Sequence, residues 1–207
     1  MRKLLIAFAL AIAHFSTGAI SAEIAPDVLA RSVTDEILAL IRADKDLQAG
    51  HPQKVMQIVE SKVLPHFNFT RMTQLAVGRN WRQASAEQQK MLIDEFRTLL
   101  VRTYTTAFTQ YRNETVDYRP LRMAPTDTDV VVKSLIKRAA GQPVAVDYSM
   151  EKAAGSWKVY DVKIEGISLV ENYRNTFNNE IQRGGVDGLI KTLSDKNRLL
   201  ATQSAKR

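Results

Sequence analysis

Hydrophobic positions follow a helical period over the first third of the chain. Steps of three and four residues predict a first helix with apolar positions at Val28, Leu29, Val33, Ile37, Leu40 and Ile41. A second amphipathic run contains Val55, Ile58, Val59 and Val63. It is expected to stop at Leu64-Pro65, since proline cannot continue a helix. A third run over residues 70–77 is expected to end at Gly78.

The most clearly marked helix begins at residue 85. Ser85 and Gln88 have the spacing of a capping box, in which each side chain binds the backbone amide of the other residue. An apolar stripe then continues to about residue 112 through Leu92, Phe96, Leu99, Leu100, Tyr104, Phe108 and Tyr111. A helix of roughly 28 residues would be about 42 Å long, so it requires a large surface to pack against.

After residue 113 the period changes from helical to alternating. A short strand over residues 116–119 and longer ones over 130–137, 144–151 and 157–164 are predicted, with turns at 140–143 and 153–156. In the last strand the apolar positions change parity between Val159 and Tyr160, which predicts either a bulge or a strand that is apolar on both faces. Four strands with short turns indicate an antiparallel meander that leaves one face free for the long helix.

The chain returns to a helical period after Gly166. Ser168 and Glu171 have the spacing of a second capping box. The helix that follows has apolar positions at Leu169, Tyr173, Phe177 and Ile181. Gly184-Gly185 is expected to end it, and a last helix over residues 186–200 precedes a basic tail. The predicted fold class is α+β, with a four-stranded antiparallel sheet packed against long helices and a helical N-terminal part.

The N-terminus has the three parts of a secretory signal peptide. Arg2 and Lys3 precede the apolar residues 4–15, and small residues follow up to Ala22. About 12 apolar residues fall short of the roughly 20 that span a bilayer, and the chain has no cysteine for a lipid anchor. We therefore expect residues 1–22 to be removed on export, leaving a soluble periplasmic protein of a Gram-negative bacterium.

The rest of the chain divides into three parts by pattern. These are an N-terminal helical region (residues 23–84), a central region with the long helix, the sheet and the following helix (residues 85–190), and a C-terminal helix end with a basic tail (residues 191–207). We expect the central region to form the functional site.

The net charge of +7 is concentrated at the ends of the chain. Arg2 and Lys3 leave with the signal peptide, and residues 191–207 carry a net +4. Residues 71–112 also have a basic excess, which acidic stretches on either side offset. A nucleic-acid groove usually requires basic surface across the domain with interleaved aromatic residues, so we expect no nucleic-acid partner.

Residues with catalytic potential are scarce. His51 and His66 are the histidines that follow the signal, and neither has a partner at a metal-ligand spacing. Asp147, Glu151 and Asp161 alternate with apolar residues, which is typical of a solvated sheet face rather than of an acid/base pair. The sequence thus predicts no catalytic residue, no metal and no cofactor.

Apolar residues on the long helix, the strands and the following helix are expected to face one another. They are Phe96, Leu100, Tyr104, Phe108, Val144, Val146, Tyr148, Val162, Ile164, Tyr173 and Phe177. Such a set forms either a solid core or the wall of a cavity. The pattern alone favours the core, because most such stripes simply pack.

Four segments carry a recognisable pattern: residues 64–69 (LPHFNF), 76–88 (AVGRNWRQASAEQ), 157–162 (WKVYDV) and 165–174 (EGISLVENYR). Together they resemble the MlaC family of periplasmic phospholipid-binding proteins, also called toluene-tolerance auxiliary proteins. The resemblance covers essentially the whole mature chain, and the last segments are the most specific. Asn80 departs from it, because an aromatic residue is expected there.

The resemblance implies a monomeric phospholipid carrier rather than an enzyme. Such a carrier shuttles lipid between an outer-membrane lipoprotein-porin complex and an inner-membrane ABC transporter with its MCE-domain protein, and so maintains outer-membrane lipid asymmetry. An NTF2-like sheet, a helical subdomain and a deep pocket for the acyl chains are also implied, with the head group near solvent. This favours a cavity wall over a solid core for the apolar set above.

Three basic residues are candidates for contact with the lipid phosphate at the mouth of the expected pocket. They are Arg79, Arg82 and Arg102, although surface solvation or partner docking explains them more simply. Two alternatives from other functional classes are a periplasmic enzyme on an NTF2-like scaffold and a periplasmic chaperone or adaptor that binds protein through the basic tail.

Overall fold

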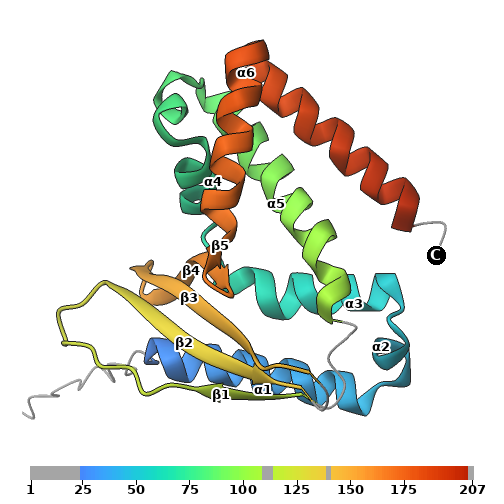
Figure 1. Cartoon of the computed structure of the whole chain (residues 1–207), viewed down its shortest axis with the longest axis vertical. Helices are drawn as coiled ribbons and strands as arrows, with labels where there is room; N and C mark the ends of the chain where they lie inside the picture. Colours follow the sequence, from blue (N-terminus) through green and yellow to red (C-terminus); the bar gives the residue numbers. More distant parts are fainter. Residues whose placement is uncertain (1–23, 109–113, 139–140, 205–207) are drawn as a thin grey trace, which may run out of the picture.

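The computed structural model describes residues 24–108, 114–138 and 141–204, with the backbone alone for residues 106–108 and 204. A curved antiparallel sheet and helix α1 make up one part of the molecule, and helices α4, α5 and α6 make up the other (Figure 1). The segment from α2 to the start of α4 lies between them. The predicted α+β class is confirmed.

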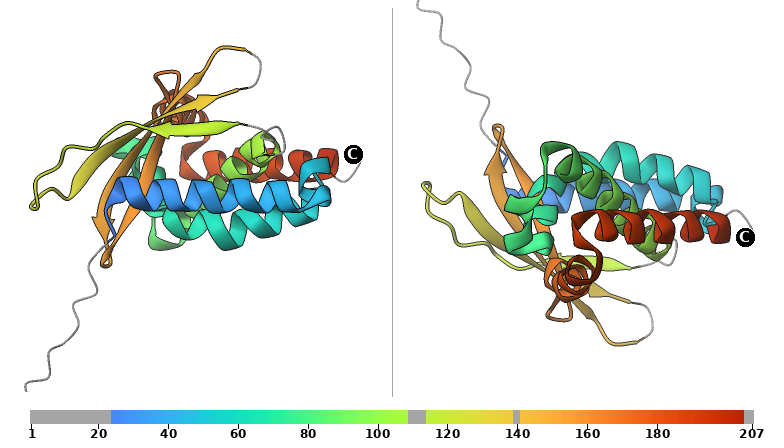
Figure 2. Two further views of the ribbon diagram at one scale, coloured as in Figure 1. Left: turned by 90° about the horizontal axis from the view of Figure 1, so that it is seen from below. Right: turned by 90° about the horizontal axis from the view of Figure 1, so that it is seen from above.

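Helix α1 (Pro26–Ala43) begins as its sequence predicts, with proline in the first turn, where a missing amide costs nothing. Asp44 then caps the short helix α2 (Lys45–Ala49) by accepting the backbone amides of Asp46 and Leu47 at 2.8 and 3.2 Å. The chain reverses at Gly50, which has a φ of 76°. Helix α3 (Pro52–Ile58) then runs back beside α1 (Figure 2).

The second predicted amphipathic run is less regular than a single helix. After α3 the backbone widens into a π-helical turn, η1 (Val59–Val63), and tightens into a 3-10 turn, η2 (Leu64–His66), that contains Pro65. Helix α4 (Phe69–Val77) follows and ends at Gly78, whose φ is 63°, as predicted. A 3-10 segment, η3 (Gly78–Gln83), leads to the long helix.

Helix α5 (Ala86–Phe108) starts at the predicted capping box. The Ser85 amide donates to Gln88 Oε1 at 2.9 Å, and the Gln88 amide donates to Ser85 Oγ at 3.2 Å. Gln88 Nε2 also donates to Asp187 of α6 at 2.7 Å, so the box ties α5 to a second helix. The predicted continuation over residues 109–112 lies outside the described residues.

Removing the capping hydroxyl is expected to weaken this helix start. The variant Ser85→Ala leaves one first-turn amide without its acceptor, which costs about 1 kcal/mol of unfolding free energy. Urea unfolding followed by circular dichroism measures the loss. Ser61→Ala is the matched control, because the Ser61 hydroxyl donates to the carbonyls of Gln57 and Ile58, about one turn before it, and caps no helix. Equal midpoints for the two variants would contradict the capping role.

The sheet is a meander of five antiparallel strands in the order β1 (Thr115–Tyr118), β2 (Asp129–Lys137), β3 (Val144–Ala153), β4 (Ser156–Ile164) and β5 (Ile167–Ser168). Four strands were predicted, and the short β5 is an addition. It forms because Glu165 and Gly166 both have positive φ, 50° and 80°, which closes a two-residue hairpin.

The predicted bulge lies in β4. Ser149 of β3 pairs with Asp161, whereas the next residue, Met150, pairs with Val159, so Tyr160 is the extra residue. The bulge lets Trp157 and Val159 face the same side of the sheet as Val162, despite the change of parity. It also turns Asp161 to the other side, toward the start of α6.

Helix α6 (Leu169–Ser204) consists of two arms that meet at Gly185, where φ is 66° and ψ is −169° (Figure 1). The predicted break at this glycine pair is confirmed. The second arm is longer than predicted, since it continues through the expected start of the basic tail to Ser204. The first arm packs Tyr173 and Phe177 against Phe96 of α5, with ring centroids 5.1 and 5.0 Å from it.

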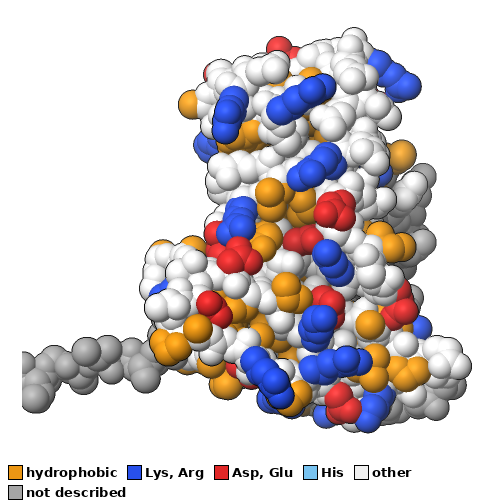
Figure 3. Space-filling view, turned by 60° about the vertical axis from the view of Figure 1, so that its left-hand side comes forward, with side chains coloured by type: hydrophobic (Ala, Val, Ile, Leu, Met, Phe, Trp, Pro, Cys, Tyr) orange, Lys and Arg blue, Asp and Glu red, His pale blue; other side chains and the backbone are white. Residues whose placement is uncertain are grey.

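Figure 3 shows how charged side chains are distributed on one face of the molecule. On the face that Figure 3 shows, basic side chains lie singly and are interspersed with acidic ones over the middle and lower parts. Among the described residues, no helix is long and apolar enough to cross a membrane.

Candidate functional site

A cavity of about 300 Å³ lies between the sheet and the helices. The inner face of the sheet forms one wall, with Val116, Ile136, Val146, Tyr148, Met150, Val159, Val162 and Ile164. Helix α1 forms a second wall, with Leu29, Ala30, Val33, Thr34, Ile37, Leu38 and Ile41. The volume lies at the lower end of the range for ligand pockets in proteins.

The remaining walls come from two further segments. The stretch from η1 to α4 contributes Val59, Val63, Leu64, His66, Phe67, Phe69 and Met72. The second half of α5 contributes Leu100, Val101, Tyr104 and Thr105. The four walls thus come from elements far apart in the sequence, and almost every side chain they present is apolar.

The hydroxyl groups of the walls are bonded to other protein groups. Thr105 Oγ1 donates to the Val101 carbonyl of its own helix. Thr34 Oγ1 shares a hydrogen bond of 2.6 Å with the Tyr118 hydroxyl, which also donates to the Ala30 carbonyl at 3.0 Å. Because these groups are satisfied within the protein, the cavity presents a surface suited to an apolar ligand.

The walls are also electrically neutral near physiological pH. Burial, together with the hydroxyl of Tyr104, raises the pKa of Tyr173 behind the wall to about 12. Burial likewise raises the pKa of Tyr104 itself. Among the described lining residues, His66 is the group that can gain a charge at mildly acidic pH, and burial and the nearby Lys158 lower its pKa.

His66 is expected to make stability fall at acidic pH. Its pKa in the folded protein lies below the ordinary value of 6.5, so the unfolded chain takes up the proton first as pH falls through that value. The unfolding free energy of the native protein should therefore drop between about pH 7 and about pH 5 more steeply than that of His66→Gln. Urea midpoints measured across this interval test it, and parallel profiles for the two proteins would contradict it.

Six of the predicted lining residues do line the cavity. They are Leu100, Tyr104, Val146, Tyr148, Val162 and Ile164. Val144 packs against the same sheet core but does not reach the cavity. The side chain of Phe108 lies outside the described residues.

The other three predicted lining residues lie elsewhere. Phe96 and Phe177 are almost fully buried in the helical core of α4, α5 and α6, and Tyr173 packs against that core. The reason is that the apolar stripe of α5 contacts different parts of the protein along its length. Its first half packs against α4 and α6, and its second half faces the cavity.

About half of the cavity wall lies outside the region in which the site was expected. The expected site lay within residues 85–190, whereas α1 and the stretch from Val59 to Met72 line it as well. Periodicity identified the apolar face of α1 through Val33, Ile37 and Ile41. It carried no information on whether that face meets a solid core or a cavity.

None of the three candidate arginines lines the cavity. Arg79 and Arg82 are exposed on η3, beside α4 and α6. Arg102 lies on the opposite side of α5 from the cavity and donates to the Asn197 carbonyl of α6. Asn80, where an aromatic residue was expected, donates to Asn178 of α6 at 3.0 Å.

The prediction of a solvated carboxylate face is wrong for two of its three residues. Asp161 is buried beneath the start of α6, where it accepts hydrogen bonds from Ser168 Oγ and the Val170 amide. Glu151 accepts from Asn68 and from Arg71, whose guanidinium also binds Asp129 and stacks on Tyr160. None of these carboxylates lines the cavity, and each is occupied in holding helices to the sheet.

The part of the chain that the structure describes contains no group of three or more His, Asp or Glu residues placed to hold a metal ion. Ser168 is a helix cap, as predicted, since its Oγ accepts the Glu171 amide at 3.0 Å. What the arrangement offers is therefore a neutral apolar container.

The chain is similar to known proteins in sequence and in structure. A family model described as MlaC protein matches residues 31–195. The phospholipid-binding protein from Ralstonia solanacearum, solved at 1.53 Å in complex with a phospholipid, is 46% identical to this chain. It superposes with a TM-score of 0.78, and the match covers 84% of this chain and 98% of that one.

Two curated relatives are more distant in sequence. The intermembrane phospholipid transport system binding protein MlaC of Haemophilus influenzae is 26% identical over 172 residues, which cover 82% of this chain and 80% of the relative. The toluene tolerance protein ttg2D of Pseudomonas putida is 25% identical over 183 residues, which cover 88% and 84%.

Proposed function

The chain belongs to the MlaC family, and from this premise we propose that it is a phospholipid carrier of the periplasm, with the cavity as its lipid site. The observation that carries the proposal is the character of the cavity, whose walls are almost entirely apolar and carry no charged group near neutral pH. The related protein of known structure was solved with a phospholipid bound.

A carrier is needed because free phospholipid crosses water very slowly. Two acyl chains of about sixteen carbons contain on the order of 30 methylene groups, and each gains about 0.8 kcal/mol on leaving water. The total of roughly 24 kcal/mol keeps free lipid from crossing an aqueous compartment at a useful rate. Acyl chains enclosed in the cavity avoid this cost, while the head group remains near solvent.

The proposed transport path has two membrane partners. An outer-membrane lipoprotein-porin complex and the MCE-domain protein of an inner-membrane ABC transporter exchange lipid with the carrier, and the exchange maintains outer-membrane lipid asymmetry. Residues 1–22 act as the export signal, and the mature protein works as a monomer without enzymatic activity. Resemblance to the family supports this part of the proposal.

Mass spectrometry of bound lipid tests the function. The full chain is expressed with its N-terminal segment, purified from the periplasm without detergent, and extracted with organic solvent. We expect phospholipid in near-stoichiometric amount. A protein that is folded and periplasmic but carries no lipid would overturn the carrier proposal.

A further inference from the structure

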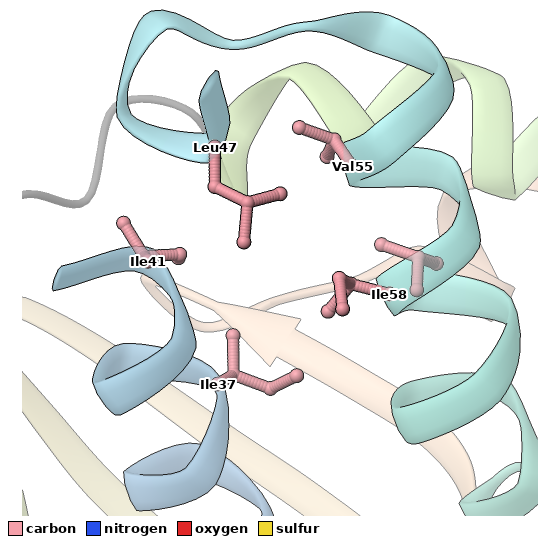
Figure 4. A pocket seen from close by; sticks show the side chains of 6 residues that line it. Ile37, Ile41, Leu47, Val55 and Ile58 are labelled. Atoms are coloured by element: carbon pink, nitrogen blue, oxygen red, sulfur yellow. The ribbon is translucent and has the colours of Figure 1, made fainter. Parts of the chain in front are cut away.

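A small pocket lies at the end of the molecule where α1, α2 and α3 reverse direction. Ile37 and Ile41 of α1, Leu47 of α2 and Val55 and Ile58 of α3 point into it, as Figure 4 shows, and Val59 completes its lining. Its volume is about 10 Å³, about the least that can hold one water molecule. Because all its walls are apolar, it is a dry packing gap.

This end pocket adjoins the main cavity. Ile37, Ile41 and Val59 line both spaces, so their side chains form the partition between them. Beyond the partition lie Leu47, Val55 and Ile58. Leu47 and Val55 are 4% and 5% exposed and so are shielded from solvent, whereas Ile58 is half-buried.

The outer side of the same reversal is polar. Lys54 Nζ lies 2.5 Å from Asp44 Oδ2 and 3.0 Å from Asp46 Oδ2, and the Asp44 side chain caps α2. An apolar chain that advanced past Leu47 would have to break this capped turn. The reversal therefore closes the cavity at a fixed depth along α1.

We propose that the end pocket limits the length of the acyl chain that the protein accepts, with Leu47 as the residue that sets the stop. This inference rests on the proposed function and names the ligand class more closely, as phospholipids whose longer chain ends in the end pocket, against Leu47. A chain that is too long leaves methylene groups outside the apolar walls. Each such group disfavours binding by about fourfold relative to a chain that fits.

Two variants change the depth of this end in opposite directions. Leu47→Ala removes three carbon atoms from the far wall and enlarges the pocket, whereas Val55→Leu adds one and fills it. Leu189→Ala is the matched control for loss of core volume, because Leu189 is equally well buried in the helical core but lines neither space. If Leu47→Ala fails to fold, Val55→Leu alone tests the idea.

The experiment measures chain-length selection directly. Delipidated protein is incubated with vesicles of equal parts of dimyristoyl, dipalmitoyl and distearoyl phosphatidylglycerol, re-isolated, and its lipid identified by mass spectrometry. Relative to wild type, we expect Leu47→Ala to raise the stearoyl-to-myristoyl ratio by at least about fourfold, which corresponds to one methylene group. Val55→Leu should lower that ratio, and Leu189→Ala should leave it unchanged.

The outcomes separate this inference from the proposed function. If folded Leu47→Ala and Val55→Leu load lipid with the wild-type ratio, the end pocket does not select chain length, although the protein remains a carrier. The same conclusion follows if Leu189→Ala shifts the ratio as strongly as Leu47→Ala. If the wild-type protein loads no lipid, the carrier proposal fails and this inference fails with it.

Discussion

Replacing Val146 with tryptophan is expected to reduce the bound lipid by more than tenfold while leaving the protein folded. Val146 lies near the start of β3, paired with Ser134 and Ile164, and its side chain lines the cavity. An indole there occupies much of a space of about 300 Å³. If it excludes only two methylene groups, binding weakens by about 1.6 kcal/mol, which is more than tenfold.

The control for this variant lies on the opposite face of the same sheet. Val131 of β2 is 43% exposed and points away from the cavity, so Val131→Trp introduces the same side chain without filling the site. Overpacking at Val146 costs about 1–3 kcal/mol of stability, which circular dichroism and thermal unfolding reveal. Lipid extracted per mole of protein decides the question. A folded Val146→Trp protein with the wild-type lipid load would show that the ligand binds elsewhere.

Local features of this fold could be predicted where the residues concerned interact with near neighbours in the sequence. The capping box of Ser85 and Gln88 and the cap at Ser168 each involve atoms within three residues of one another. The bulge at Tyr160 and the break at Gly185 also leave a mark in the local pattern. These predictions are confirmed because backbone sterics and nearby hydrogen bonds decide them.

The partner of an apolar face could not be predicted in the same way. Phe96 and Tyr104 belong to one stripe of α5, yet Phe96 is buried between helices and Tyr104 faces the cavity. Both positions look alike in the hydrophobic pattern, because periodicity gives the direction of a side chain and not what lies opposite. The wall formed by α1 was missed for this reason.

The burial of a charged side chain was the other feature that the hydrophobic pattern did not predict. Asp161 alternates with apolar residues as a solvated carboxylate would, but the bulge at Tyr160 and the hairpin at Glu165 and Gly166 bring the start of α6 over it. Asp161 is therefore buried by a tertiary contact that the alternation of residues along the strand does not reveal. The consequence is that one acidic side chain joins the sheet to the longest helix.

Removing the Asp161 carboxylate is therefore expected to destabilise the fold strongly. Asp161 is 7% exposed, and its two oxygens accept from Ser168 Oγ at 2.6 Å and from the Val170 amide at 3.1 Å. Asp161→Ala leaves both buried donors without an acceptor, at about 1–3 kcal/mol each. A total loss near 3 kcal/mol lowers the melting temperature of a chain of this size by about 10 °C. Differential scanning calorimetry measures both quantities.

Two further variants show whether the burial of these donors is the cause. Asp161→Asn keeps one acceptor oxygen and should fall between wild type and Asp161→Ala. Asp147→Ala also removes a carboxylate from the sheet, but Asp147 lies on β3 opposite Lys133 and Lys163, where a cross-strand charge pair contributes less than about 1 kcal/mol. Equal losses for Asp161→Ala and Asp147→Ala would contradict the role of Asp161 as the buried acceptor for Ser168 and Val170. Since Asp161 does not line the cavity, the folded fraction of Asp161→Ala should still bind lipid, which separates its effect on folding from the effect of Val146→Trp on binding.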